Sequence, residues 1–262
     1  MSNWPVIDSP RFDDMLGISG DGGTTVTASG TAHTKGSWVD LGTTTYDWES
    51  FDLFFAEDGS GYDQLMDFAI NQSGTYRPLV TDLAIGDGYN SGQFGAVAIS
   101  IPVRVPRGAV VSARTQSGTA SNPCKVAVRG KSRSVLGMVG HASMEAITAF
   151  TNSQPTASIT LASGSPAYTQ LVASTAKRYA ALLVSPQNND ASAATYGLID
   201  IGIGASDTPL VNSILWRQIG YSFVLNPLFI PMNIPAGSRL SGRIRSATST
   251  AVRRVALYGL VA

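Results

Sequence analysis

Two stretches of the chain nearly repeat each other: IPVRVPRGAVVSARTQSGT, residues 101–119, and IPMNIPAGSRLSGRIRSAT, residues 230–248. A shift of 129 residues aligns 101–130 with 230–259 without a gap and leaves eleven identical positions. One of them is an arginine, Arg114 in the first copy and Arg243 in the second. Self-similarity at a fixed spacing indicates a repeated structural unit, so it has to be explained before any other feature.

Shorter matches precede each copy in the same order. PLVTDLAI from Pro78 matches PLVNSILW from Pro209, and DFAI from Asp67 matches DIGI from Asp200. Short gaps separate these blocks, as loops of different length would produce. We therefore predict that one domain has been duplicated in tandem.

The repeated segment has the pattern of a strand followed by a turn. Ile101, Val103 and Val105 alternate with Pro102, Arg104 and Pro106, which is the period of two that a β-strand shows. Because proline cannot donate to a ladder, we expect this strand at a sheet edge or running beyond the pairing. Residues 106–108 and 235–237 are Pro-x-Gly segments, in which proline fixes φ and glycine can reach positive φ, so both copies predict a turn.

The same reading predicts about eight strands in each unit. In the first unit they cover residues 24–28, 37–41, 49–56, 64–71, 78–85, 95–105, 110–116 and 125–131. In the second unit they cover residues 157–162, 170–174, 179–185, 195–204, 210–216, 222–234, 239–245 and 254–261. The best helix candidate is short, at 142–150, between the units. Eight antiparallel strands in about 110 residues ordinarily close as two packed sheets. The predicted fold is all-β, a tandem duplication of an eight-stranded antiparallel jelly-roll-like β-sandwich.

The expected domain organisation follows from the repeat. Residues 1–22 have no counterpart in the second unit and form an N-terminal arm. The first sandwich covers 23–134, a linker covers 135–153, and the second sandwich covers 154–262. An arm is ordered only where something holds it, so we expect this arm to contact a neighbouring chain.

Composition agrees with a β protein rich in tight turns. Charged residues make up 14%, and there are 27 glycines. Cys124 is the single cysteine, which excludes an intrachain disulfide and a cysteine metal cluster, and we expect it as a small buried side chain in a strand. No signal peptide is apparent, and prolines break the most apolar stretch, 221–234. We expect a soluble protein made in a cytoplasm, without membrane insertion.

Charge is distributed unevenly although the net charge is zero. Residues 1–67 hold 12 acidic and 2 basic side chains, and the remaining residues hold 6 acidic and 16 basic ones. We interpret this as acidic faces meeting basic faces between subunits or domains. Nucleic-acid binding is the rival interpretation, but the basic residues alternate with apolar ones and no recognised motif is present, so we do not expect it.

A search for chemistry in the sequence finds no catalytic set. His33 and His141 lie in different units and lack a metal-ligand spacing, there is no Gly-x-Ser-x-Gly elbow, and no phosphate-binding loop is complete. The acidic segment EDGSGYDQ, residues 57–64, lacks the ligands of a calcium loop. The sequence alone does not exclude a pair of carboxylates in the first unit. We predict no enzyme activity, no cofactor and no metal.

Aromatic residues offer the one possible ligand site. Residues 46–55 have the sequence YDWESFDLFF, and on a strand Phe51 would face away from Phe54. One side of this strand would then belong to the core, and the other could stack on a sugar. Core packing is the default interpretation for these aromatic side chains. Tyr62 and Tyr89 lie in glycine-rich segments and are the candidate ligand contacts.

The second copy of the repeat, with the strand RRVALYGLV that follows it, resembles modules of virion structural proteins of tailed bacteriophages and related particles. The resemblance covers about thirty residues in each copy. It implies β-sandwich units of tail, fibre-adaptor or head-decoration proteins that assemble as trimers or rings, and it assigns no site residue.

We therefore predict a structural component of a virion, made in the host cytoplasm, that acts through homo-oligomeric and virion contacts. Its expected partners are other copies of itself, as a trimer or ring, and other virion proteins through the arm. Two alternatives use the same fold: a carbohydrate- or receptor-binding protein that recognises a host surface glycan, and a double-jelly-roll capsid protein.

Overall fold

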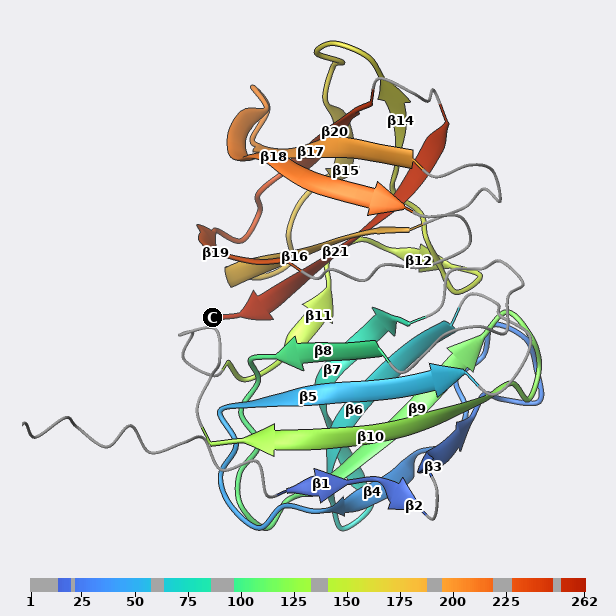
Figure 1. The fold of residues 1–262 in the computed structure, drawn as a ribbon. Coiled ribbons are helices and arrows are strands. Elements are labelled where there is room, and N and C mark those ends of the chain that lie inside the picture. Colours follow the sequence, from blue (N-terminus) through green and yellow to red (C-terminus); the bar gives the residue numbers. More distant parts are fainter. Residues whose placement is uncertain are drawn as a thin grey trace, which may run out of the picture.

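The computed structural model describes residues 14–19, 22–57, 64–85, 97–132, 141–187, 195–218, 228–246 and 251–262. Within these ranges the chain is all-β, as the sequence predicts, with strands joined by turns and no α-helix. The described part accordingly contains no helix long and apolar enough to cross a membrane. Figure 1 shows two stacked lobes, which we call the first lobe (β1 to β10) and the second lobe (β11 to β21).

The first lobe consists of two sheets that face each other. One has the order β2-β3-β10-β5-β8, with β1 also paired to β10, and the other has the order β7-β6-β9-β4. The strands are β1 (Met15–Leu16), β2 (Ile18–Ser19), β3 (Gly22–Thr27), β4 (Val39–Thr43), β5 (Ser50–Glu57), β6 (Gln64–Gln72), β7 (Thr75–Ala84), β8 (Val97–Ile101), β9 (Val110–Ser117) and β10 (Pro123–Lys131).

The second lobe repeats this arrangement. Its strands are β11 (Met144–Ala146), β12 (Phe150–Thr151), β13 (Gln154–Pro155), β14 (Ser158–Ala162), β15 (Thr169–Val172), β16 (Tyr179–Gln187), β17 (Thr195–Ile203), β18 (Thr208–Gln218), β19 (Leu228–Ile234), β20 (Leu240–Arg245) and β21 (Val252–Val261). β14, β21, β16 and β19 form one side, and β18, β17, β20 and β15 form the other.

Strand order is identical in the two lobes. β3-β10-β5-β8 corresponds to β14-β21-β16-β19, and β7-β6-β9-β4 corresponds to β18-β17-β20-β15. Counting eight strands along each lobe, the two sheets read 1-8-3-6 and 2-7-4-5. This is the order of an eight-stranded jelly roll, in which two Greek keys are wrapped around each other. The predicted all-β, jelly-roll-like fold is confirmed.

Each lobe has its own core, built by the inward side chains of alternating strands. The second-lobe core includes Ile159, Ile201 and Leu257. The first-lobe core includes Phe51 and Phe68, and it continues across the junction to further buried apolar side chains of the second lobe, namely Ala181, Leu183, Phe229, Ala256, Tyr258 and Leu260. The two lobes therefore share a continuous apolar contact.

A short strand joins the lobes where the sequence suggested a helix. The helix predicted at 142–150 is wrong: β11 lies there, antiparallel to β21 and parallel to β7, with Met144 opposite Leu260 and Val80. Both edges of this segment are taken by strands of different lobes, and such pairing outweighs a weak local helix propensity. Through β11, and through the parallel pairing of β14 with β20 in the second lobe, one sheet of thirteen strands runs through both lobes.

Part of the segment assigned to the N-terminal arm lies on the chain itself. Residues 14–19 form β1 and β2, with Leu16 opposite Val128 on β10 and Ile18 opposite Gly23 on β3. Residues 1–13 lie outside the described residues, so the contact of the arm with a neighbouring chain stays a prediction.

The Pro-x-Gly turns have the same structure in both lobes. Gly108 and Gly237 have φ of 78° and 79°, as the sequence predicts. Each turn closes on a buried threonine: the hydroxyl of Thr44 donates to the carbonyl of Pro106, and that of Thr175 donates to the carbonyl of Pro235, both at 2.8 Å. β8 and β19 pair with β5 and β16 and lie at sheet edges, as expected. Pro102 directly follows β8, and Pro231 lies within β19.

Candidate functional site

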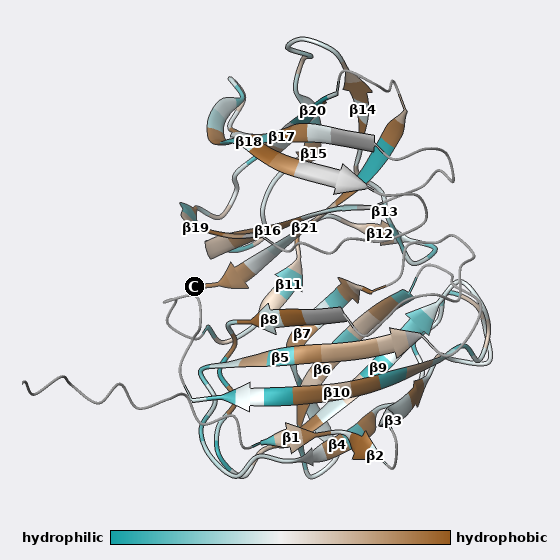
Figure 2. Cartoon of the chain, in the orientation of Figure 1, coloured by the Kyte–Doolittle hydropathy of each residue, from teal (hydrophilic) through white to brown (hydrophobic). Residues whose placement is uncertain are grey.

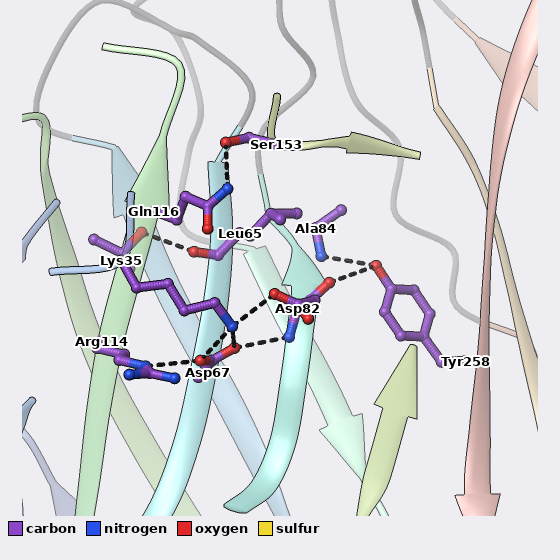
Figure 3. Close-up of polar contacts among 10 residues, drawn as sticks. Lys35, Leu65, Asp67, Asp82, Ala84, Arg114, Gln116, Ser153 and Tyr258 are labelled. Carbon is purple, nitrogen blue, oxygen red and sulfur yellow. Dashed lines mark hydrogen bonds and ion pairs between the residues drawn. The ribbon is translucent and has the colours of Figure 1, made fainter. Parts of the chain in front are cut away.

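A buried carboxylate organises the second sheet of the first lobe (Figure 3). The oxygens of Asp67 accept from Arg114 Nε at 2.8 Å, from Lys35 Nζ at 2.7 and 2.9 Å, and from the backbone N–H of Asp82 at 2.8 Å. Asp82 lies in a β-bulge with a φ of 53°, which turns its N–H toward the carboxylate. Lys35 also pairs with the Asp82 carboxylate, at 2.7 Å.

The second lobe contains the same centre at the same place. Asp200 accepts from Arg243 Nε at 2.8 Å, from Arg245 Nη2 at 3.1 Å, and from the backbone N–H of Ser213 at 2.7 Å. Ser213 lies in the equivalent bulge, with a φ of 61°. Burial opposes the charged form of Asp200, but the Ser213 N–H and the two guanidinium groups outweigh it, so its pKa lies below the ordinary value.

These two carboxylate centres join neighbouring strands, and both oxygens of each carboxylate have fixed hydrogen-bond partners. The side chain of Asp67 is 3% exposed and that of Asp200 is fully buried, and cations occupy the oxygens of both. An acid–base catalyst needs an oxygen that is accessible to a reacting proton, and these oxygens are occupied by fixed partners. Asp67 and Asp200 are therefore ion-paired clamps between β6 and β9 and between β17 and β20.

An aromatic ring covers a glycine of the repeat in each lobe. A Cβ on Gly130 would lie 2.0 Å from the ring of Trp48, and one on Gly259 would lie 2.3 Å from the ring of Tyr179. Each ring is then held by an acid: Trp48 Nε1 donates to Asp14, directly before β1, at 2.9 Å, and Tyr179 Oη donates to Glu145 on β11 at 2.7 Å. β1 and β11 therefore occupy equivalent positions in the two lobes.

The outer faces of the equivalent sheets differ in chemistry. Leu183 faces Tyr258 in the second lobe, and both are 1% exposed because they pack on the first lobe. The matching pair in the first lobe is Asp52 and Arg129, joined by an ion pair of 2.6 Å. Figure 2 shows this contrast in the hydrophobic end of β21 and the hydrophilic end of β10.

Asp52 is the centre of that polar cluster. It accepts from the Lys131 ammonium, from Arg129, and from the Ser100 hydroxyl at 2.5 Å. Burial works against the charge of Asp52, but the contacts with Lys131, Ser100 and Arg129 prevail and hold its pKa below the ordinary value.

Ion pairs within one lobe take up part of the uneven charge. Asp52, Asp67 and Glu49 belong to the acidic first quarter of the sequence, and their partners Arg129, Lys131, Arg114 and Arg104 belong to β9, β10 and the segment after β8. The interpretation of the charge pattern as a meeting of different subunits or domains is therefore wrong for these pairs. The jelly-roll order brings the first and last strands of one lobe together.

The histidines and the cysteine are in structural positions. His33 lies in an exposed turn, with Nδ1 3.2 Å from the hydroxyl of Ser153. The backbone of His141 forms an isolated parallel β-bridge with that of Val103. Burial, with a smaller contribution from the charge of Arg104, holds the pKa of His141 below the ordinary value. Cys124 is a buried thiol in β10, as predicted.

The aromatic segment 46–55 supports the core, as the default interpretation predicted. Phe51 and Phe55 are buried, and Phe54 faces the other way, with the guanidinium carbon of Arg129 at 5.4 Å from its ring centre. That outward ring is thus partly covered already. Tyr62 and Tyr89 lie outside the described residues, so their role in glycan contact stays a prediction.

The described residues contain no cluster of three or more metal-ligating side chains. Surface hollows on the described part of the chain include two of more than 400 Å³. One of about 480 Å³ lies beside β3 and β4 and is lined mostly by hydroxyl groups and Lys35, whose ammonium is already paired with Asp67 and Asp82. The other, of about 440 Å³, lies beside Leu215 on β18 and is mainly apolar.

The sequence contained a signal for the two carboxylate centres, because Asp67, Asp200, Arg114 and Arg243 all belong to the repeated blocks. It contained none for the acids that hold the rings, since Asp14 lay in the supposed arm and Glu145 in the supposed linker. The junction through β11 was missed for the same reason.

Comparison with known proteins gives weak similarities only. No family model matches the chain, and no curated protein sequence matches it. Among solved structures, the major capsid protein P2 of bacteriophage PM2 is 11% identical over 95% of this chain and 98% of that one, with a TM-score of 0.34. PNGase F, a glycosylasparaginase from Flavobacterium meningosepticum, is 9% identical over 95% and 93%, with a TM-score of 0.33. An archaeal virus protein with a triple jelly roll, from a turret assembly, is 12% identical over 92% and 61%, with a TM-score of 0.26. Scores of this size do not decide a function.

Proposed function

We propose that the chain is a structural subunit of a virus particle, formed by tandem duplication of one jelly roll and assembled as a trimer or ring. One observation carries this proposal: two lobes of identical strand order share one sheet and one apolar contact. Their equivalent contacts within each lobe are the carboxylate centres, the ring over glycine and the threonine-locked turns. The resemblance of the repeated segment to virion modules supports the same assignment.

Duplication has a geometric consequence for assembly. A trimer of two-lobed chains presents six similar lobes and can occupy a position of six-fold symmetry, or join a three-fold part to a six-fold one. Because the lobes have diverged on their outer faces, each lobe can meet a different neighbour. As a tail, fibre-adaptor or head-decoration protein, the chain would use this property in a single ring.

A double-jelly-roll shell protein is the second candidate, and the shared sheet favours it. β11 fixes the two lobes against each other, so a trimer would be a rigid six-lobed tile. Such tiles form a shell only if their rims also bind one another, whereas an adaptor stops at one ring.

Native mass spectrometry and electron microscopy of the purified chain test both forms. We expect a complex of three times the 27.4 kDa chain mass, with six lobes around its axis. Curved sheets or closed shells of these tiles would favour the shell protein, and isolated rings would favour the adaptor. A stable monomer at micromolar concentration would overturn the proposal.

A further inference from the structure

One pair of matched positions beside the carboxylate centres is buried in the first lobe and open in the second. Leu65 pairs with Ala84 in the first lobe, and Leu198 pairs with Leu215 in the second, each leucine of β6 and β17 two residues before the aspartate of its centre. Leu65 and Ala84 are 2% exposed, whereas Leu215 is 73% exposed. Leu198 and Leu215 line the open, mainly apolar hollow of about 440 Å³.

In the first lobe, segments from elsewhere in the chain cover this place. The backbone N–H of Ala84 donates to Tyr258 Oη of β21 at 2.8 Å. Gln116, which pairs with Leu65, donates from Nε2 to the hydroxyl of Ser153, between β12 and β13, at 3.0 Å. Figure 3 shows both contacts. The corresponding place in the second lobe therefore has the form of a polypeptide-binding site, and it is open on Leu215.

The two carboxylate centres also differ in charge. In the first lobe two carboxylates face two cations, namely Asp67 and Asp82 with Lys35 and Arg114. In the second lobe the single carboxylate of Asp200 faces both Arg243 and Arg245, which leaves one positive charge over. Arg245 lines the hollow, and its Nε is buried without a hydrogen-bond partner. A carboxylate next to apolar side chains would complement both the charge and the apolar wall.

The first thirteen residues of the chain, which lie outside the described residues, contain such a sequence. Their sequence is MSNWPVIDSPRFD, in which Val6 and Ile7 are followed directly by Asp8. Thirteen residues can span at most about 45 Å, and a domain of about 100 residues has a radius of gyration of about 13 Å. The segment is therefore long enough to pass beyond the lobe that carries it. β1, which follows it, and β18 lie at opposite ends of the molecule in Figure 1, which favours the hollow of a neighbouring copy.

We propose that residues 4–8 of one copy bind the hollow beside β18 of a second copy, with Ile7 on Leu198 and Leu215 and with Asp8 beside Arg245. The proposal names the partner surface of the N-terminal arm and rests on the assembly put forward under Proposed function. Because the arm and the hollow are different patches, the contact is head-to-tail, and contacts of this kind generate rings when the rotation closes.

Two variants of the full chain test the two parts of the contact by sedimentation velocity. Leu215→Arg places a charge against the apolar side chains, and we expect association to weaken at least about 30-fold, as at an interface hot spot. Asp8→Asn removes only the charge that faces Arg245, and we expect a loss of about fivefold that disappears at high salt.

Val252→Arg is the matched control for Leu215→Arg. Val252 is 43% exposed and is not among the residues that line the hollow, so association should stay as in the wild type. Circular dichroism verifies that all three variants keep the strand content of the wild type. An equal loss of association in Leu215→Arg and Val252→Arg would overturn the proposal.

Cross-linking of two different chains identifies the occupant. A chain with Ile7→Cys is mixed with a chain with Leu215→Cys, and a short bis-maleimide should give covalent dimers from the mixture but not from the wild type, whose Cys124 is buried. In the double variant, a cross-link that stays within one chain would overturn a second copy as the occupant. If the wild type is a monomer, the proposed function fails and this contact with it. If the wild type assembles but the mixed chains do not cross-link, the contact alone is refuted.

Discussion

The outer faces of β10 and β21 occupy equivalent places in the two lobes and carry opposite chemistry. On β21, Tyr258 and Leu260 are buried against the first lobe. On β10, the corresponding Arg129 and Lys131 form ion pairs with Asp52. The strands that carry these side chains pair in the same register, Asp52 with Arg129 and Leu183 with Tyr258.

The comparison separates two kinds of position. Gly130 and Gly259 point into a lobe and keep both their type and their contact with an aromatic ring. Asp67 and Asp200 lie on the strand face opposite the core residues Phe68 and Ile201, and they keep their type and an arginine partner. Arg129 and Tyr258, by contrast, differ because only the second of these faces packs on the other lobe. If this separation is correct, equivalent substitutions at the matched positions that keep their type should have equal effects in the two lobes.

The glycines under the rings should give the largest effect. Gly130→Ala and Gly259→Ala each place a Cβ where the ring of Trp48 or Tyr179 now lies, 2.0 and 2.3 Å away. Overpacking of a buried site costs up to about 3 kcal/mol or more, and here a whole ring has to move. We expect a loss of about 3 kcal/mol in the free energy of unfolding for each variant, measured by urea denaturation.

Gly22→Ala is the control for this pair. A Cβ on Gly22 meets nothing within 4 Å, so this change should be nearly neutral. A large loss at one of the two covered glycines and none at the other would break the equivalence of the lobes.

The sequence predicted the parts of the fold that depend on local patterns. Alternation of apolar and polar residues marked the sixteen jelly-roll strands, because a half-buried strand has a period of two. The Pro-x-Gly turns were predictable because their chemistry is local. The repeat also contained the aspartates and arginines of both carboxylate centres, although not their contacts.

The parts that were not predictable depend on long-range pairing. β11 is three residues long and is a strand only because β7 and β21 lie on either side of it. Likewise, nothing in the sequence near Asp14 shows that its carboxylate accepts from Trp48, 34 positions away. The matching sequences PLVTDLAI and PLVNSILW likewise do not show that the apolar side chains of β7 are buried while Leu215 on β18 is exposed.

The carboxylate centres should give an intermediate effect with a defined pH dependence. Asp200→Asn removes the charge that faces Arg243 and Arg245, whose side chains are 23% and 30% exposed and so partly solvated. We expect a loss of about 2 kcal/mol at neutral pH, in the range measured for hydrogen bonds to charged groups. Asp67→Asn in the first lobe should cost a similar amount.

Because the folded-state pKa of Asp200 lies below the ordinary carboxyl value of 3.8, its contribution is fully present above that value and is lost as the pH falls through the lowered pKa. The wild type should therefore lose stability between about pH 5 and pH 2, and Asp200→Asn should lose less over that interval. Urea midpoints measured across this pH range check the slope. Equal slopes for wild type and variant would show that Asp200 does not contribute in this way.

The threonines that lock the Pro-x-Gly turns give the smallest and most stringent test. Thr44 accepts from the N–H of Ala109 at 3.1 Å, and Thr175 accepts from the N–H of Ser238 at 3.0 Å, while each hydroxyl donates to a proline carbonyl. Thr44→Val and Thr175→Val keep the shape of the side chain but remove these hydrogen bonds, at a cost of about 1 kcal/mol each. Thr44→Ser and Thr175→Ser keep the hydroxyl and are the controls. Since the two turns share no partner, the double valine variant should lose the sum of the single losses to within about 0.5 kcal/mol. A loss clearly larger than that sum would mean that the two turns are energetically coupled, although they lie in different lobes.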